Sequence, residues 1–299
     1  MVGSALILLR EGLEGALIIA IVLAYLGKLG RRDRFPVIWA GAGVAIGIAL
    51  ALGVILFATI GELHGDARKI TFTAIMLTAS GVLTWMIFWM RKQARAVKGE
   101  LQQKVDQALL VGSAGALAGV VFVGVLRESI ETVLFFLAAA GQTSTLNSLV
   151  GGSLGLAGAI VLAIGFYKGA SWMDLRQFFA VSGAIVLLFA AGLFARGLAE
   201  LQVLGAIPTF WYPVFDLSWI TPLAPGNFLG DLARGLFGWN PAPSIEELGA
   251  WVGYVAVIGT LYFRGLPRPW FGRMPVRAAA SKPAPAAAPA PAAETSDAA

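Results

Sequence analysis

Two copies of an Arg-Glu-x-x-Glu motif lie inside otherwise apolar stretches of this chain. The charged residues are Arg10, Glu11 and Glu14 in the first copy and Arg127, Glu128 and Glu131 in the second. Carboxylates bind hard cations and exchange protons. Each residue of a helix advances about 100°, so the arginine and both glutamates of one copy share a face. The remaining sides of both stretches are apolar, so we expect the charged faces to point into a helical bundle.

The charges of the two motifs do not cancel. A charged residue in the middle of a membrane helix costs about 2.5–3.5 kcal/mol to insert. Pairing of Arg10 with Glu14 and of Arg127 with Glu131, four residues apart, would be a purely structural role. It would leave half of the carboxylates unpaired, with a formal charge of about −2. Because buried unpaired carboxylates take up protons or hold a cation, the motifs favour a functional cation or proton site.

Composition and hydropathy indicate the elements that must position these charges. The chain has 299 residues, of which 58% are hydrophobic and only 13% are charged, against about 25% charged in an ordinary soluble domain. Windows of about 20 apolar residues predict membrane spans. They lie near 4–27, 36–60, 69–90, 109–140, 148–168, 177–199 and 247–264. The fourth stretch is longer than one crossing needs, so we expect it to tilt, to break, or to run into a loop at its Gly141 end.

The distribution of basic residues predicts the orientation. Most of the 22 Lys and Arg residues follow the first, third, fifth and seventh stretches, which the positive-inside rule places in the cytoplasm. The N-terminus is then outside and the C-terminus cytoplasmic. The net charge of +5 therefore reflects membrane topology, and we expect the lipid bilayer and not nucleic acid as a partner. Residues 266–299 are rich in Ala and Pro and predict a disordered cytoplasmic tail.

The motifs are part of an internal duplication. Residues 8–18 align with residues 125–135, and each segment opens a block of three predicted spans. Since three is odd, the fourth span crosses the membrane in the opposite sense to the first, as in an inverted-topology repeat. We therefore predict an all-α polytopic membrane protein with seven transmembrane helices, built as a 3+3 inverted repeat plus one. Both motifs then lie in the outer half to the middle of the bilayer, where four carboxylates can converge.

The ligand types limit the cation. The chain has no cysteine, and its one histidine is His64, which excludes a thiolate or histidine-based centre. An all-oxygen anionic cage favours hard cations. Paired Arg-Glu-x-x-Glu motifs in the first and fourth of seven spans resemble the oxidase-dependent iron transporter family, the high-affinity iron permeases of fungi and bacteria. The resemblance covers residues 1–265, and residues 238–244 resemble its bacterial branch.

The family resemblance implies a function and a site. Glu11, Glu14, Glu128 and Glu131 would coordinate iron, with Arg10 and Arg127 holding them in place. The expected activity is uptake of iron, taken as ferric, across the bacterial inner membrane, with iron as cargo and no resident cofactor. Family members work beside a multicopper oxidase or a periplasmic iron-binding or peroxidase protein, and we expect such a partner here.

Other interpretations remain open from the sequence. The residues Glu62, His64 and Asp66 fall in an external connection, where they would either receive iron before permeation or form an ordinary solvated loop. The connection from 200 to 246 is acidic and rich in tryptophan, which indicates a segment at the membrane interface. A permease for another heavy cation such as lead would use the same motif residues. An intramembrane enzyme would need an activated nucleophile, and only Ser129 and Thr132 lie near. A scaffolding subunit would need no more than paired charges.

Overall fold

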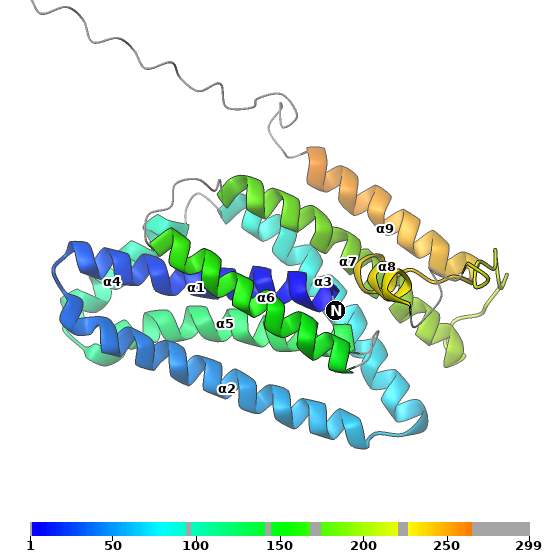
Figure 1. The fold of residues 1–299 in the computed structure, drawn as a ribbon, viewed down its shortest axis with the longest axis horizontal. Helices are drawn as coiled ribbons and strands as arrows, with labels where there is room; N and C mark the ends of the chain where they lie inside the picture. Colours follow the sequence, from blue (N-terminus) through cyan, green and yellow to red (C-terminus); the bar gives the residue numbers. More distant parts are fainter. Residues whose placement is uncertain (1, 94–96, 141–144, 168–174, 221–226, 265–299) are drawn as a thin grey trace, which may run out of the picture. The chain divides into compact units, whose positions relative to one another are not determined.

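The computed structural model describes residues 2–93, 97–140, 145–167, 175–220 and 227–264. Within these ranges the regular structure is helical, without strands. The helices are α1 (Val2–Lys28), α2 (Phe35–Glu62), α3 (Gly65–Gln93), α4 (Val97–Val111), α5 (Ala114–Ala140), α6 (Thr145–Tyr167), α7 (Leu175–Val203), α8 (Phe228–Phe237) and α9 (Ile245–Arg264), with a 3-10 turn at Arg32–Arg34 (Figure 1). They form a compact unit that ends at Phe263. The predicted Ala- and Pro-rich tail lies outside the described residues.

Each predicted span is occupied by a helix, namely α1, α2, α3, α5, α6, α7 and α9. Four helical segments are long and apolar enough to cross a membrane by length and composition: 32–62, 65–90, 146–165 and 180–203. Helices α1 and α5 are continuous, but the charged residues of the two motifs interrupt their apolar sequence. The all-helical membrane fold is thus confirmed, while the count of seven spans and the orientation stay predictions.

The fourth predicted span, 109–140, is two helices. Helix α4 ends at Val111 and α5 begins at Ala114. Gly112 between them has a φ of 69°, a left-handed conformation that glycine adopts without steric cost. The Ser113 hydroxyl oxygen accepts a hydrogen bond from the Ala116 backbone N–H at 3.3 Å and so caps the start of α5. The stretch therefore breaks near its beginning, and its Gly141 end lies outside the described residues.

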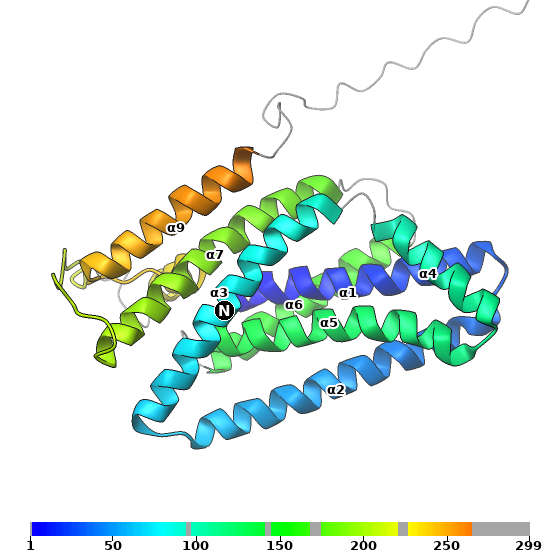
Figure 2. The ribbon, with the colours of Figure 1, turned by 180° about the vertical axis from the view of Figure 1, so that it is seen from behind.

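The helices pair in a pattern that matches the duplication. Helix α1 packs most extensively on α6, α5 on α2, and α3 on α7, while α1 and α5 also pack on each other. The pattern is unchanged when α1, α2 and α3 are exchanged with α5, α6 and α7. Helices α1 and α5 run in opposite directions (Figures 1 and 2). This is the arrangement that the predicted inverted repeat requires, although a symmetry axis in the membrane plane stays a prediction.

Small residues allow α1 to approach α6 closely, and α2 to approach α5. A Cβ atom on Gly155 of α6 would overlap the backbone of Ala5 in α1, and one on Gly41 of α2 would overlap the backbone of Ala118 in α5. Close backbone approach at small residues is the usual way in which membrane helices gain van der Waals contact. Glycine at these two positions thus brings each motif helix against the second helix of the other half.

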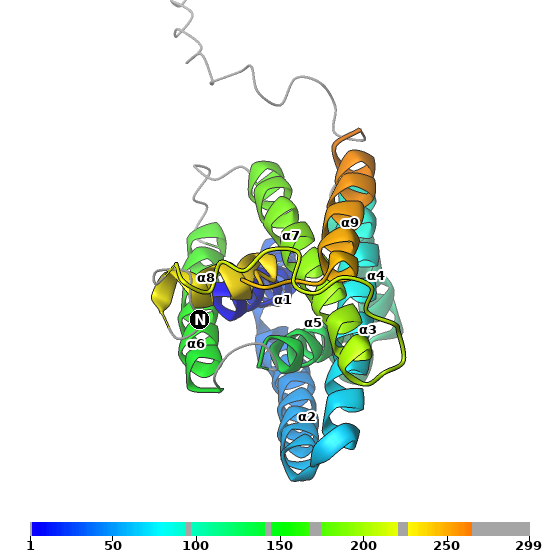
Figure 3. The ribbon, with the colours of Figure 1, turned by 90° about the vertical axis from the view of Figure 1, so that its right-hand side faces the viewer.

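The predicted connection from 200 to 246 is partly helical. Helix α7 continues to Val203, and α8 lies within the connection. Helix α8 packs on α7 and on α1 near the N-terminal end of the chain (Figure 3). The connection is also tied to α9, because the carboxylate of Glu246 accepts hydrogen bonds from the Phe210 backbone N–H at 2.7 Å and the Gln202 side chain at 2.8 Å.

Candidate metal site

The two motifs meet where α1 packs against α5. Arg10 is 2% exposed and Glu11 is 1% exposed, and the other three motif glutamates are also buried. Arg127 is the exception, with a side chain that is 33% exposed. Burial of this many ionisable groups requires that they compensate one another, because an isolated charge in a low-dielectric interior is very costly.

Each arginine pairs within its own motif, as predicted from the spacing. Arg10 Nε lies 3.2 Å from a carboxylate oxygen of Glu14. Arg127 Nε donates a hydrogen bond to Glu131 Oε1 at 2.9 Å. Arg10 Nη1 also lies 3.7 Å from Glu11 Oε1. The two arginines thus form ion pairs with three of the four motif carboxylates, and the formal excess of negative charge that the sequence indicates persists in the folded protein.

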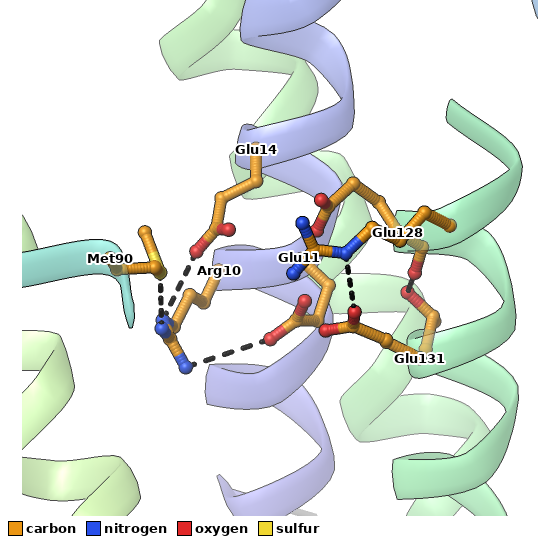
Figure 4. A network of polar contacts seen from close by, with 8 residues as sticks. Arg10, Glu11, Glu14, Met90, Glu128 and Glu131 are labelled. Atoms are coloured by element: carbon orange, nitrogen blue, oxygen red, sulfur yellow. Dashed lines mark hydrogen bonds and ion pairs between the residues drawn. The ribbon is translucent and has the colours of Figure 1, made fainter. Parts of the chain in front are cut away.

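Three carboxylates from the two motifs converge. Glu11 of α1 and Glu128 and Glu131 of α5 each place one oxygen within 4.8 Å of the others. They are the one group of three or more potential metal ligands that comes together within the described ranges. Figure 4 shows the Glu131 side chain reaching from α5 toward Glu11 on α1. Oxygen ligands lie about 2.0–2.6 Å from Mg²⁺ or Ca²⁺, so oxygens this close together can share one small cation.

The oxygens of this cluster have unused capacity to accept. Both carboxylate oxygens of Glu11, together with Oε2 of Glu128 and Oε2 of Glu131, are buried and have no hydrogen-bond partner among the described residues. A buried acceptor without a donor loses its hydration and gains nothing in return. The cluster is therefore suited to a cation, which would satisfy several of these oxygens at once.

Comparison with known proteins identifies the class of transporter. Residues 1–266 match the iron permease FTR1 family. The chain belongs to this family. It is 37% identical over 264 residues to the ferrous iron permease EfeU of Shigella sonnei strain Ss046, a match covering 88% of this chain and 94% of the relative. The match to the same-named protein of Escherichia coli O157:H7 has these same values.

A more distant relative agrees with this assignment. The ferrous iron permease EfeU of Yersinia pestis is 34% identical over 260 residues, covering 86% of this chain and 92% of the relative. No solved structure matches the chain. The family predicted from the paired motifs is thus confirmed, and the chain is an iron permease of the membrane. Permeases are transporters, and the names of the relatives describe no enzyme.

The fourth glutamate of the iron permease motifs does not join the cluster. Glu14 is directed to the side of Arg10 and Met90 in Figure 4, and it is not part of the converging group. Its ion pair with Arg10 accounts for this position. Glu131 is paired with Arg127 as well, yet it lies within the converging group. The four-glutamate site stays a prediction.

Helix α3 contributes partners that the sequence analysis missed. Arg10 Nη2 donates to Met90 Sδ at 2.7 Å. The Arg127 guanidinium carbon lies 4.2 Å from the ring centroid of Trp89 and 5.4 Å from that of Trp85. Two tryptophans four residues apart share one face of a helix, and this spacing could be seen in the sequence. The sequence did not show that this face turns toward the motif arginines.

The predicted iron-receiving residues are exposed at one end of the iron permease. Glu62 ends α2, His64 follows it, and Asp66 lies in the first turn of α3. Asp66 lies 3.8 Å from Lys69 in an exposed ion pair. The three side chains do not converge as metal ligands in the part of the chain that the structure describes. Their role in receiving iron stays a prediction.

Proposed function

We propose that this permease moves ferrous iron across the bacterial inner membrane through a site formed by Glu11, Glu128 and Glu131, with Glu14 as a fourth carboxylate used during passage. The observation that carries the proposal is the convergence of three buried carboxylates, drawn from both motif copies, within 4.8 Å. Their buried oxygens without hydrogen-bond partners supply the hard ligands that a divalent cation needs.

Charge supports a divalent cargo. Four glutamates and two arginines leave a formal charge of about −2, which one ferrous ion would neutralise. Ferric iron, the cargo expected from the family resemblance, would leave an excess positive charge. The relatives named ferrous iron permease also favour the ferrous ion. Iron is then the transported substrate and not a resident cofactor.

The position of the site suggests how transport proceeds. Helices α1 and α5 are the first helices of the two predicted repeats, and substrate sites of inverted-repeat transporters lie where the repeats meet. Rocking of one half against the other, across seven spans with the N-terminus outside, would expose the carboxylates to each side in turn. A periplasmic iron-binding, oxidase or peroxidase partner would deliver iron, and Glu62, His64 and Asp66 would receive it on the external side.

Uptake of radiolabelled iron into proteoliposomes tests the proposal. Iron is supplied as ferrous ion kept reduced by ascorbate, and separately as ferric citrate, to the wild type, Glu11→Gln and Glu128→Gln. Glu100→Gln is the matched control, because Glu100 is an exposed carboxylate on α4, outside the cluster and outside the proposed entry residues. Loss of a residue that only supports a metal ligand already costs about 10–100-fold in metal affinity. Glu11 and Glu128 would be ligands themselves, so we expect at least a tenfold loss of iron uptake in both site variants and no loss in the control.

Two results would overturn parts of the proposal. Wild-type uptake rates in Glu11→Gln and Glu128→Gln would show that the cluster is not the iron site. Faster uptake of ferric citrate than of ferrous ion would show that the cargo is ferric. Lead(II) added as a competitor, which uses the same hard and anionic ligands, measures how strongly the site selects iron.

A further inference from the structure

Helix α3 carries neither motif, yet its side chains contact the arginine of each motif. Met90 contacts Arg10, and Trp85 and Trp89 cover the guanidinium of Arg127. These three residues lie within two turns of α3. Helix α3 thus contacts the arginines of both motifs through side chains that carry no charge.

Arg127 is held from two sides. Its Nε donates to Glu131 Oε1 at 2.9 Å, and its face lies 4.2 Å from the Trp89 ring centroid. The Trp85 and Trp89 rings stack with centroids 5.9 Å apart and an interplanar angle of 22°. A guanidinium over a tryptophan face gains about 0.5–1 kcal/mol when exposed and about 2 or more when desolvated. Stacking therefore helps to fix a side chain that remains one-third exposed.

Arg10 is held in a corresponding way. Its Nε faces Glu14 and its Nη1 faces Glu11. The third nitrogen, Nη2, contacts the Met90 sulfur, a weak acceptor without charge. Met90 thus contacts the guanidinium nitrogen of Arg10 that is not paired with Glu11 or Glu14.

The position of the two arginines decides how many carboxylate oxygens stay free. Arginine binds a carboxylate most strongly through two parallel hydrogen bonds. If Arg127 rotated into such a pair, it would occupy both oxygens of Glu131 or reach those of Glu128, and it would compete with a cation. In the observed arrangement Arg127 engages one oxygen of Glu131 and leaves Oε2 free.

We propose that Trp85, Trp89 and Met90 are positioning residues that hold Arg127 and Arg10 away from the free carboxylate oxygens and thereby set the affinity for iron. This inference rests on the proposed cation site. It assigns to α3 a role in binding, in addition to its packing against α7. Trp89 carries the largest part, because its ring is closest to the guanidinium.

The test compares Trp89→Leu and Trp89→Phe with the wild type in proteoliposomes, measuring KM and kcat for ferrous iron. Trp39→Leu on α2 is the control, since Trp39 is 58% exposed. We expect Trp89→Leu to raise KM about tenfold, which lies between the effects of an exposed and of a desolvated cation–π contact, with little change in kcat at saturating iron. Trp89→Phe keeps an aromatic face and should retain most of the affinity, and Trp39→Leu should match the wild type.

A double-mutant cycle separates positioning from packing. In the Arg127→Met background there is no guanidinium to hold, so Trp89→Leu should leave the KM of the single variant unchanged. A further rise in KM of the same size in that background would overturn the inference. So would a KM for Trp89→Leu equal to that of Trp39→Leu.

Glu128→Gln distinguishes failure of this inference from failure of the proposed function. If Glu128→Gln abolishes uptake while Trp89→Leu behaves as Trp39→Leu, the carboxylate site stands and the role of α3 is wrong. If Glu128→Gln transports iron as the wild type does, the site itself is wrong, and the inference about α3 falls with it.

Discussion

Glu11 and Glu14 stand three residues apart on one helix, and both are buried, but only Glu11 reaches across to α5. The ion pair of Glu14 with Arg10 turns it away from the cluster. In the second motif Glu131 is paired with Arg127 in the same way, yet it stays in the cluster. Two motifs of the same sequence pattern therefore contribute unequal numbers of ligands.

This inequality predicts different effects for the second glutamate of each motif. Glu131→Gln removes an oxygen from the cluster and the partner of Arg127, so we expect it to weaken binding of ferrous iron at least tenfold. Glu14→Gln keeps all three converging carboxylates and should weaken binding several-fold less. Equilibrium binding of ferrous iron to purified protein measures both. Equal losses in the two variants would mean that all four glutamates bind the ion together.

The buried arginine of the first motif should matter for stability. Removing one partner of a buried ion pair costs about 3–5 kcal/mol, because the other charge is left uncompensated. Arg10→Met leaves both Glu11 and Glu14 without their cation, so its thermal unfolding midpoint in detergent should fall, while Arg10→Lys should fall less. Ferrous ion should restore part of the loss in Arg10→Met by supplying positive charge. A midpoint equal to that of the wild type would contradict the buried pairing.

At the scale of the elements, the close approach of α6 to α1 depends on Gly155. Gly155→Leu would force the two backbones apart and displace the helix that carries Glu11, so we expect uptake to be lost and the unfolding midpoint to fall. Gly47→Leu on α2 is the control, since a side chain there meets nothing within 4 Å. Similar behaviour of the two variants would show that this contact does not hold α1 in place.

A second element-scale prediction concerns the connection between α7 and α9. The pKa of Glu246 is lowered from 4.5, first by the Phe210 backbone N–H that donates to its carboxylate. A lowered folded pKa means that this anchor is intact above the unfolded value and is lost as the pH falls through the folded value. Limited proteolysis of the segment 204–220 in the wild type should therefore accelerate only when the pH falls below the ordinary range of a glutamate. In Glu246→Ala the cleavage should be fast already at pH 7. Equal cleavage rates of the wild type and Glu246→Ala at pH 7 would contradict the role of Glu246 as an anchor.

At the scale of the whole molecule, the sequence predicted what repeats along the chain and missed what depends on packing between helices. Apolar length located a helix in every predicted span, and the spacing of four residues predicted both arginine pairs. The break at Gly112 is local and was within reach of the sequence, because a Gly-Ser pair commonly ends one helix and caps the next. The displacement of Glu14 and the contacts of Trp89 depend on side-chain rotamers and on the rotation of α3, which periodicity does not fix.

The orientation predicted from basic residues can be checked across the whole chain. The protein has no cysteine, so a single introduced cysteine is the only thiol that a membrane-impermeant reagent can label. Asp33, between α1 and α2, and His64, between α2 and α3, are both exposed. With the N-terminus outside, His64→Cys should be labelled in intact spheroplasts, whereas Asp33→Cys should be labelled only after permeabilisation.

Two further positions test the span count, because α4 and α8 are helices in addition to those that occupy the predicted spans. Ser113 precedes α5 and Ser218 lies between α7 and α8, and both are exposed. If α1, α2, α3, α5, α6 and α7 each cross once, Ser113→Cys should behave as Asp33→Cys does and Ser218→Cys as His64→Cys does. Labelling of Ser113→Cys in intact spheroplasts would mean that α1 and α5 enter from the same side. Since an inverted repeat requires opposite entry, that single result would remove the symmetry between the two motifs.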